Sequence, residues 1–227
     1  MADHLGRGRR VVGLALVGQP SRGPQGQERT LARGHLTQRT LPWFALTLLA
    51  SACGTSGYDQ ERERWTRSDE AYEGFEARLF IDATLKVEPF RRAYVHEYAR
   101  LFDLTPAQEA DVLSAELTED RSNLVLVVAL YTPNRNWNDL NPAHGFWEVR
   151  LQNQRGDTAT PYSVTRIDAR NPAWRQLYPL FGTHDVLWEL RFERALPDER
   201  PLAAKGDTLS LIIAGAPVRV RLSWVMP

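Results

Sequence analysis

Cysteine, lysine and long apolar runs are all scarce in this sequence. Cys53 is the single cysteine among 227 residues, so no disulfide within the chain can hold the fold together. Lysine occurs only at Lys86 and Lys205, and arginine supplies the rest of the positive charge. The apolar stretch from Leu41 to Ala52 is a dozen residues long, whereas a helix needs about 20 residues to cross the hydrocarbon core of a bilayer. This stretch is therefore shorter than a helix that spans a membrane.

Catalytic motifs are also missing. Only His96, His144 and His184 follow Cys53, and Ser163 does not lie in the G-x-S-x-G pattern of a nucleophile elbow. Zinc sites need Cys and His at close spacing, which the chain does not offer. The oxygen-rich stretch NWNDLN could resemble a calcium loop, but it lacks the central Gly and terminal Glu of an EF-hand, so Asx turns explain it more simply. We expect no enzyme activity, no bound metal and no cofactor.

The segment around Leu41 to Gly54 (LPWFALTLLASACG) has the order of a secretory leader. Arg39 precedes the apolar run, and the small residues Ala50, Ser51 and Ala52 lead directly to Cys53. A charged, an apolar and a small-residue region in this order fit cleavage rather than anchoring by the helix itself. Ordinary secretion, or a buried apolar helix before a structural cysteine, are the alternatives.

This segment resembles the type II signal peptide of bacterial lipoproteins. In that family the residue three before the cysteine is most often leucine, a position that Ala50 holds here, and the next two residues are small. The resemblance implies that Ala50, Ser51 and Ala52 are read by the processing machinery and that Cys53 carries a covalent lipid. It also implies a bacterial cell envelope, and Gly54 rather than Asp after the cysteine favours the periplasmic side of the outer membrane.

The stretch before the leader, residues 1–40, is polar and rich in Gly and Arg. Such a composition buries too little apolar surface to fold, so we expect a disordered extension. Signal peptides normally begin with only a few residues, and the true start codon is therefore expected further on, near Leu36. The alternative is a basic arm that binds RNA.

The charge of the residues that follow Cys53 excludes nucleic acid as a partner. Seven of the 28 basic and two of the 28 acidic residues precede Cys53, which leaves 21 against 26 and a formal charge of −5. A mildly acidic body has no electrostatic reason to bind phosphate backbones. About 175 residues suffice for one domain with its own core.

The pattern after Cys53 predicts a tether followed by a mainly β domain. We expect the lipidated cysteine and tether in residues 53–74, with a brief helix or an extended lead-in around Trp65, and the domain in residues 75–227. Alternating apolar residues predict seven strands, and helical spacing with a capping box at Thr105 and Gln108 predicts a helical hairpin at about 88–120. The expected strands are Phe75–Lys86, Leu124–Tyr131, Phe146–Gln152, Thr160–Ile167, Val186–Glu193, Thr208–Ala214 and Val218–Val225.

Seven short strands with Gly and Pro turns predict an α+β, mainly β protein built on an antiparallel β-sandwich. The stretch from Leu124 to Val225 resembles the immunoglobulin-like domains of bacterial envelope lipoproteins in three segments: the strand Leu124 to Tyr131, the run VRLQNQRGD and the strand Leu187 to Glu193. The helical hairpin is an insertion relative to that pattern. The resemblance carries no chemistry to transfer.

Aromatic residues near the loops are the remaining binding signal. Trp137, His144 and Trp174 are the candidate binding residues, with Arg135 beside them, because exposed Trp rings can stack on sugars or pack on a partner protein. In the alternative interpretation Trp147, Trp188 and Trp224 pack in the core while Trp137 and Trp174 cover its ends. We expect a non-enzymatic interaction or assembly module of the envelope, bound to membrane lipid through Cys53 and to envelope proteins. A small-molecule or glycan binder is the second hypothesis.

Overall fold

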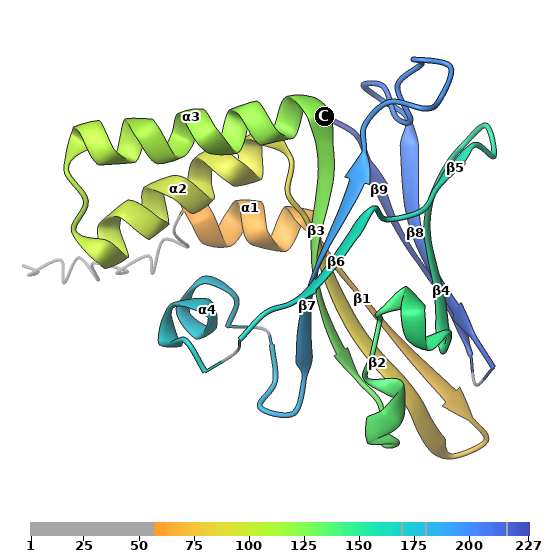
Figure 1. Cartoon of the computed structure of the whole chain (residues 1–227). Coiled ribbons are helices and arrows are strands. Elements are labelled where there is room, and N and C mark those ends of the chain that lie inside the picture. The colour runs from red at the N-terminus through yellow and green to blue at the C-terminus, as the bar shows by residue number, and fades with distance from the viewer. Residues whose placement is uncertain (1–56, 169, 180, 217) are drawn as a thin grey trace, which may run out of the picture. The chain divides into compact units, whose positions relative to one another are not determined.

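The computed structural model describes residues 57–227 apart from 169, 180 and 217. The predicted extension, leader, lipidation site Cys53 and processing residues Ala50, Ser51 and Ala52 lie outside the described residues. The described part contains two antiparallel sheets with helices beside the first of them (Figure 1). The predicted α+β, mainly β fold with two antiparallel sheets is therefore confirmed.

The first sheet has five strands in the order β1-β2-β3-β7-β6. Its central strand is β3, whose apolar sequence LVLVVAL is buried on both faces between the second sheet and the helices. The strands of this sheet are β1 (Thr66–Glu73), β2 (Glu76–Leu85), β3 (Asn123–Tyr131), β6 (Ser163–Arg166) and β7 (Val186–Glu193).

The second sheet has four strands in the order β5-β4-β8-β9. Strand β9 alternates strictly between exposed and buried residues, as expected of a strand with one wet face. A turn at Gly156 joins β4 to β5, and its φ of +91° explains why glycine occupies that position. These strands are β4 (Trp147–Asn153), β5 (Thr158–Ala159), β8 (Thr208–Gly215) and β9 (Arg219–Val225).

The core between the sheets contains the three tryptophans that the sequence assigned to it. Trp147, Trp188 and Trp224 are each at most 5% exposed and belong to one apolar cluster with residues of both sheets. The indole of Trp224 donates a 2.8 Å hydrogen bond to the carbonyl of Trp65, so this buried polar group is paired. Trp65 in turn belongs to a segment that was expected to be a tether.

The structure corrects the sequence prediction for that segment. Residues Gly57–Trp65 form helix α1 and Thr66–Glu73 form strand β1, and both pack as part of the domain. Strand β1 pairs with β2 along its whole length, and Arg67 donates a 3.1 Å hydrogen bond to the carbonyl of Ser223 in β9. The domain therefore includes residues 57–73, because backbone pairing with β2 stabilises a strand whose own sequence is mostly polar.

Two further elements were not predicted, and one predicted strand is shorter. The two-residue strand β5 and the helix α4 (Pro172–Leu177) carried no periodic signal of sufficient length. The expected strand over Thr160–Ile167 is reduced to the four residues of β6. The total is nine strands in the described residues rather than seven.

The predicted helical hairpin consists of α2 (Glu88–Phe102) and α3 (Pro106–Ser122), which lie side by side in Figure 1. Thr105 and Gln108 form the capping box, with each side chain bonded to the backbone of the other residue. His96 contacts Glu109 across the two helices at 3.2 Å, as expected of a solvated, interhelical histidine.

Ion pairs connect α3 to the rest of the domain. All of its side chains keep some exposure, whereas Arg91 on α2 is fully buried. One guanidinium nitrogen of Arg91 binds both Glu116 and Glu119 of α3, the latter at 2.9 Å. Lys86 binds Glu116 at 3.1 Å. The hairpin is thus held together by a charge cluster centred on a buried arginine.

Below α2, an aromatic cluster joins α1, α2 and α4. Tyr58, Tyr94 and Tyr178 surround Phe90, with ring centroids between 5.9 and 6.3 Å from that ring. Burial raises the pKa of all three tyrosines well above the usual value of 10, and for Tyr94 the nearby carboxylate of Glu116 adds to the effect.

This cluster makes alkaline pH destabilising. A phenol whose pKa is raised in the folded state contributes stability that is complete below about pH 10 and is lost as the pH rises toward the folded pKa. We expect the free energy of unfolding, measured in urea, to fall as the pH rises from 10 to 12. The doubly substituted protein Tyr94→Phe/Tyr178→Phe keeps both rings and is expected to show a shallower fall; an equally steep fall would contradict the assignment.

Candidate site at the mouth of the sandwich

The loop that follows β3 is shaped by side chains that bond the backbone. The side chain of Asn138 accepts a 2.5 Å hydrogen bond from the amide of Thr132, at the point where β3 ends. Asn134 and Asn141 each accept from the amide two residues on, at 3.1 and 3.0 Å. The bonds of Asn134 and Asn141 are Asx turns, and the one at Asn141 lies within the NWNDLN stretch, in agreement with the simpler interpretation.

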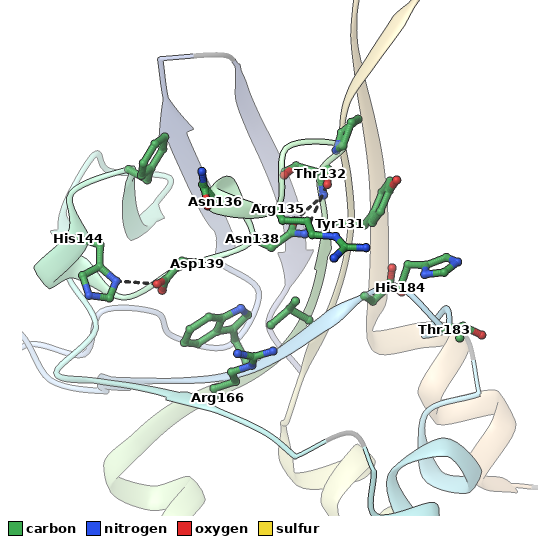
Figure 2. Close-up of a pocket in the computed structure, with 15 residues that line it drawn as sticks. Tyr131, Thr132, Arg135, Asn136, Asn138, Asp139, His144, Arg166, Thr183 and His184 are labelled. Atoms are coloured by element: carbon green, nitrogen blue, oxygen red, sulfur yellow. Dashed lines mark hydrogen bonds and ion pairs between the residues drawn. The ribbon is translucent and has the colours of Figure 1, made fainter.

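Asp139 and His144 form a side-chain hydrogen bond across the same loop. The two side chains are 2.6 Å apart, and Asp139 also accepts from the amide of Asn141 at 2.8 Å. The contact fixes the imidazole at the edge of the loop (Figure 2). Within the ranges that the structure describes, no group of three or more His, Cys, Asp or Glu side chains could hold a metal ion.

Trp137 fastens the loop to the core. Its backbone carbonyl accepts a 2.6 Å hydrogen bond from the indole of the buried Trp147, and its ring packs against Phe146 at 6.2 Å. Trp137 is partly buried and packs on the apolar cluster. These contacts hold the loop against the core, so the loop forms a fixed wall.

Beside this wall is a cavity of about 870 Å³. It is bounded by the end of β3, the loop just described, Arg166 of β6 and the segment that leads into β7 (Figure 2). Trp188 is one of its lining residues and lies directly opposite Arg166 in the β6–β7 pairing, so both side chains are on the same face of the first sheet.

Two positive side chains line this cavity, and neither forms an ion pair with a carboxylate of the described residues. Arg135 and Arg166 form no ion pair and no side-chain hydrogen bond within residues 57–168, 170–179, 181–216 and 218–227. Asp168 is near Arg166, but it is bound to Arg170 at 2.9 Å, and that bond is the main cause of its lowered pKa. In Figure 2 the two guanidinium groups approach the hollow from different elements.

A buried donor also lacks a partner here. The indole nitrogen of Trp188 is buried, and no described residue accepts its hydrogen. The indoles of Trp147 and Trp224 each donate to a carbonyl, so Trp188 is the exception among the three core tryptophans. An unpaired buried donor costs roughly 1–3 kcal/mol.

The acidic groups around the cavity are already engaged. Asp139 is paired with His144, and Asp185 accepts a 2.5 Å hydrogen bond from the amide of Gly182. In this second contact Asp185, next to His184, bonds the backbone of the turn before β7. Among the side chains that line the cavity, the guanidinium groups of Arg135 and Arg166 are paired with no described carboxylate, and they favour an anionic ligand.

A second hollow of about 380 Å³ adjoins the first. It lies by Phe80, Asp82 and Ala129 on the opposite face of the sheet from Trp188, and it shares Tyr131 and His184 with the first cavity. Burial raises the pKa of Asp82 above its usual range, although the hydroxyl of Ser68 donates a hydrogen bond that opposes the shift.

The predicted binding residues are not brought together. His144 lines the large cavity, whereas Trp174 lines a separate hollow of about 190 Å³ and stacks on Tyr178. Trp137 lines neither of these cavities. The structure does not place Trp137, His144 and Trp174 in one pocket, and both tryptophans pack against the core, as the alternative interpretation expected.

Sequence reasoning named Arg135 but missed Arg166 and Trp188. Arg166 ends a short strand, and Trp188 was assigned to the core on the strength of its mid-strand position. The only signal in the sequence was an arginine at the end of an otherwise uncharged strand. That the indole of Trp188 is unpaired could be recognised only in the structure, where the indoles of the other two core tryptophans have hydrogen-bond partners.

No protein-family model matches the chain, and no curated protein matches it. Among the solved structures that are similar to it is a novel protein of unknown function from Burkholderia pseudomallei K96243. The likeness has a TM-score of 0.37 and 14% sequence identity, and it covers 73% of this chain and 81% of that chain. A likeness at this level carries no argument about function.

In the described part of the chain, every helix is too short or too polar to cross a membrane.

Proposed function

We propose that this protein is a lipid-anchored component of a bacterial cell envelope whose β-sandwich binds a small ligand that carries an anionic group. The observation that supports the binding role is the cavity in which Arg135, Arg166 and the indole of Trp188 all lack a partner among the described residues. Charge-assisted bonds from guanidinium groups to a carboxylate or phosphate are among the stronger polar contacts in proteins. The ligand is bound and released without chemical change.

The anchoring part of the proposal is supported by the sequence alone. The apolar stretch, the small residues Ala50, Ser51 and Ala52, and Cys53 provide the processing site and the lipid attachment. Gly54 is the reason to propose the periplasmic side of the outer membrane. A tether of only a few residues between Cys53 and α1 then keeps the domain close to the lipid surface.

An interaction or assembly module with protein partners was the first hypothesis from the sequence, and the surface gives it less support. Such a module is favoured by a contiguous apolar patch. The large apolar side chains that are exposed lie instead on several separate elements: Tyr72, Phe75, Phe102, Phe146, Tyr162 and Val225. A polar cavity with unpaired cations favours a ligand-binding role.

We also propose that the sandwich is of the immunoglobulin-like type. The order β2-β3-β7-β6 in one sheet and β4-β8-β9 in the other corresponds to the ABED and CFG sheets of that fold, with β1 and β5 as additional edge strands. In this correspondence the helical hairpin is inserted between the first two strands of the fold. The loop after β3 then corresponds to one of the loops that carry binding sites in such domains.

The binding proposal is tested by ligand-dependent stability. Glucuronate at about ten times its Kd is expected to add about 1.4 kcal/mol to the free energy of unfolding, which raises the Tm of the purified protein by roughly 3–6 °C over the same concentration of glucose. The double variant Arg135→Gln/Arg166→Gln is expected to lose this difference. Arg121→Gln removes an exposed charge on α3 and is expected to keep it. Equal Tm values in glucuronate and glucose for the unsubstituted protein would overturn the proposal.

A further inference from the structure

A strip of aromatic rings leads away from the mouth cavity across the first sheet. The rings of Tyr72, Phe80, Tyr131 and His184 follow one another with centroid separations of 6.1, 6.0 and 6.4 Å. They come from β1, β2, β3 and the segment before β7, so the strip crosses three neighbouring strands. Phe80 and Tyr131 are directly opposite in the β2–β3 pairing, which places both rings on one face of the sheet.

This end of the sheet is not covered by the helices. Farther along the same face, Val125 and Val127 of β3 are fully buried, and α3 lies against β3 there. At the other end Tyr72 is 54% exposed, and Phe80 and Tyr131 are partly exposed. Aromatic side chains that remain open to water in a row, beside a hollow, indicate a surface for a ligand with an apolar face.

The hollow beside the strip and the mouth cavity lie on opposite faces of the first sheet and adjoin at the end of β3. The hollow beside the strip and the mouth cavity share Tyr131, Thr183, His184 and Asp185. Asp82 lies in the hollow beside Phe80, and Arg135 and Arg166 lie in the mouth. From the strip toward the mouth cavity, the protein therefore presents first aromatic faces with carboxylates beside them and then guanidinium groups.

These groups match the chemistry of a sugar that carries a carboxylate. A pyranose ring presents C–H groups on its faces, which stack on aromatic rings, and hydroxyl groups on its rim, which donate to carboxylates such as that of Asp82. A carboxylate on the ring pairs with an arginine. A neutral glycan would leave Arg135 and Arg166 unpaired, so charge complementarity selects the acidic one.

We propose that the strip and the mouth cavity together bind an acidic oligosaccharide, with successive sugar rings stacked on Tyr72, Phe80 and Tyr131 and a carboxylate held by Arg135 and Arg166. The inference rests on the proposed function, since it names the ligand class of that cavity and extends the site beyond it. It explains why the aromatic rings are exposed in a row rather than buried. A lipid-anchored domain with this surface binds acidic glycan close to the membrane.

Calorimetric titration of the purified protein tests the inference with a matched set of probes. β-Linked tetraglucuronate and cellotetraose have the same backbone and differ in carboxylate against hydroxymethyl groups, and glucuronate is the single ring. We expect tetraglucuronate to bind at least about tenfold more tightly than glucuronate, and cellotetraose to bind at least about tenfold more weakly than tetraglucuronate. Tetraglutamate carries the charge without the sugar rings and is expected not to compete.

Variants of the strip separate the inference from the proposed function. Tyr72→Ala and Phe80→Leu are each expected to weaken tetraglucuronate binding about fivefold while leaving glucuronate binding unchanged. Tyr162→Ala is the matched control, because Tyr162 is 52% exposed and lines neither hollow. It is expected to change neither affinity.

Three results would overturn the inference. The first is that glucuronate binds in an arginine-dependent way but tetraglucuronate gains nothing, which leaves the proposed function intact. The second is that Tyr72→Ala and Phe80→Leu both bind tetraglucuronate as the unsubstituted protein does. The third is that tetraglutamate binds as tightly as tetraglucuronate, which makes the ligand an acidic peptide. Failure of glucuronate itself to bind would instead remove the proposed function.

Discussion

Replacing Arg91 by alanine is expected to lower the free energy of unfolding by about 3–5 kcal/mol. The side chain is fully buried, and Glu116, Glu119 and Asp120 of α3 all lie within 3.5 Å of it. Without its charge these three carboxylates repel one another beside the first sheet, and their remaining cationic partners are Lys86, Arg191 and Arg194. Urea denaturation followed by circular dichroism measures the loss.

Arg92→Ala is the matched control for this prediction. Arg92 is the next residue on α2, is about half exposed and pairs with Glu88 one turn away at 2.8 Å. Exposed pairs of this kind contribute about 0.3–0.5 kcal/mol, so this variant should be almost as stable as the unsubstituted protein. Similar losses in the two variants would show that the buried charge cluster does not hold the helical hairpin in place.

Replacing Cys53 by serine is expected to move the protein from the membrane fraction to the soluble fraction. The residue lies outside the described part of the chain, so the prediction rests on the leader-like sequence before it. Each buried methylene of an acyl chain contributes about 0.8 kcal/mol, and two or more chains make attachment stable. A serine at this position offers no thiol for the lipid.

Fractionation of cells that express the full chain, with labelled palmitate, measures this effect. Thr55→Ala changes a nearby residue without touching the sulfur and is expected to leave the protein labelled and in the membrane fraction. Equal membrane association of the Cys53→Ser protein, or a mature product that never carries the label, would contradict lipid anchoring.

The strands and helices with a strong local pattern could be predicted from the sequence. The alternation that follows Phe75 gave β2, and helical spacing with the Thr105–Gln108 capping box gave α2 and α3. In each case the signal is contained in a dozen or so residues, because side-chain periodicity and capping act over one or two turns. Nothing from the rest of the chain was needed.

Strand β1 shows why the remainder could not be predicted. Its sequence TRSDEAYE has no apolar alternation, and the same residues read equally well as a solvated tether. They form a strand because β2 offers a free edge with which they pair from Thr66 to Glu73. That edge exists only once the sheet has formed, so tertiary structure rather than local preference determines that these residues form a strand.

The candidate site was foreseen only in part for the same reason. Arg135 and His144 stand in a polar loop where a binding residue is easy to expect, and both line the cavity. Arg166 and Trp188 are far from that loop in sequence, and pairing of β6 with β7 brings them beside it. Trp137 and Trp174 looked like binding residues, yet each finds apolar neighbours in the fold and is partly buried.

The most direct measurement for the binding role is the indole N–H resonance of Trp188 during a titration with glucuronate. The Trp188→Phe variant assigns that resonance in ¹H–¹⁵N spectra of the purified protein. We predict a saturable shift of the Trp188 signal, because its unpaired N–H gains an acceptor, while the signals of Trp147 and Trp224, which already donate to carbonyls, stay in place. A Trp188 resonance that does not move at saturating glucuronate would contradict the account.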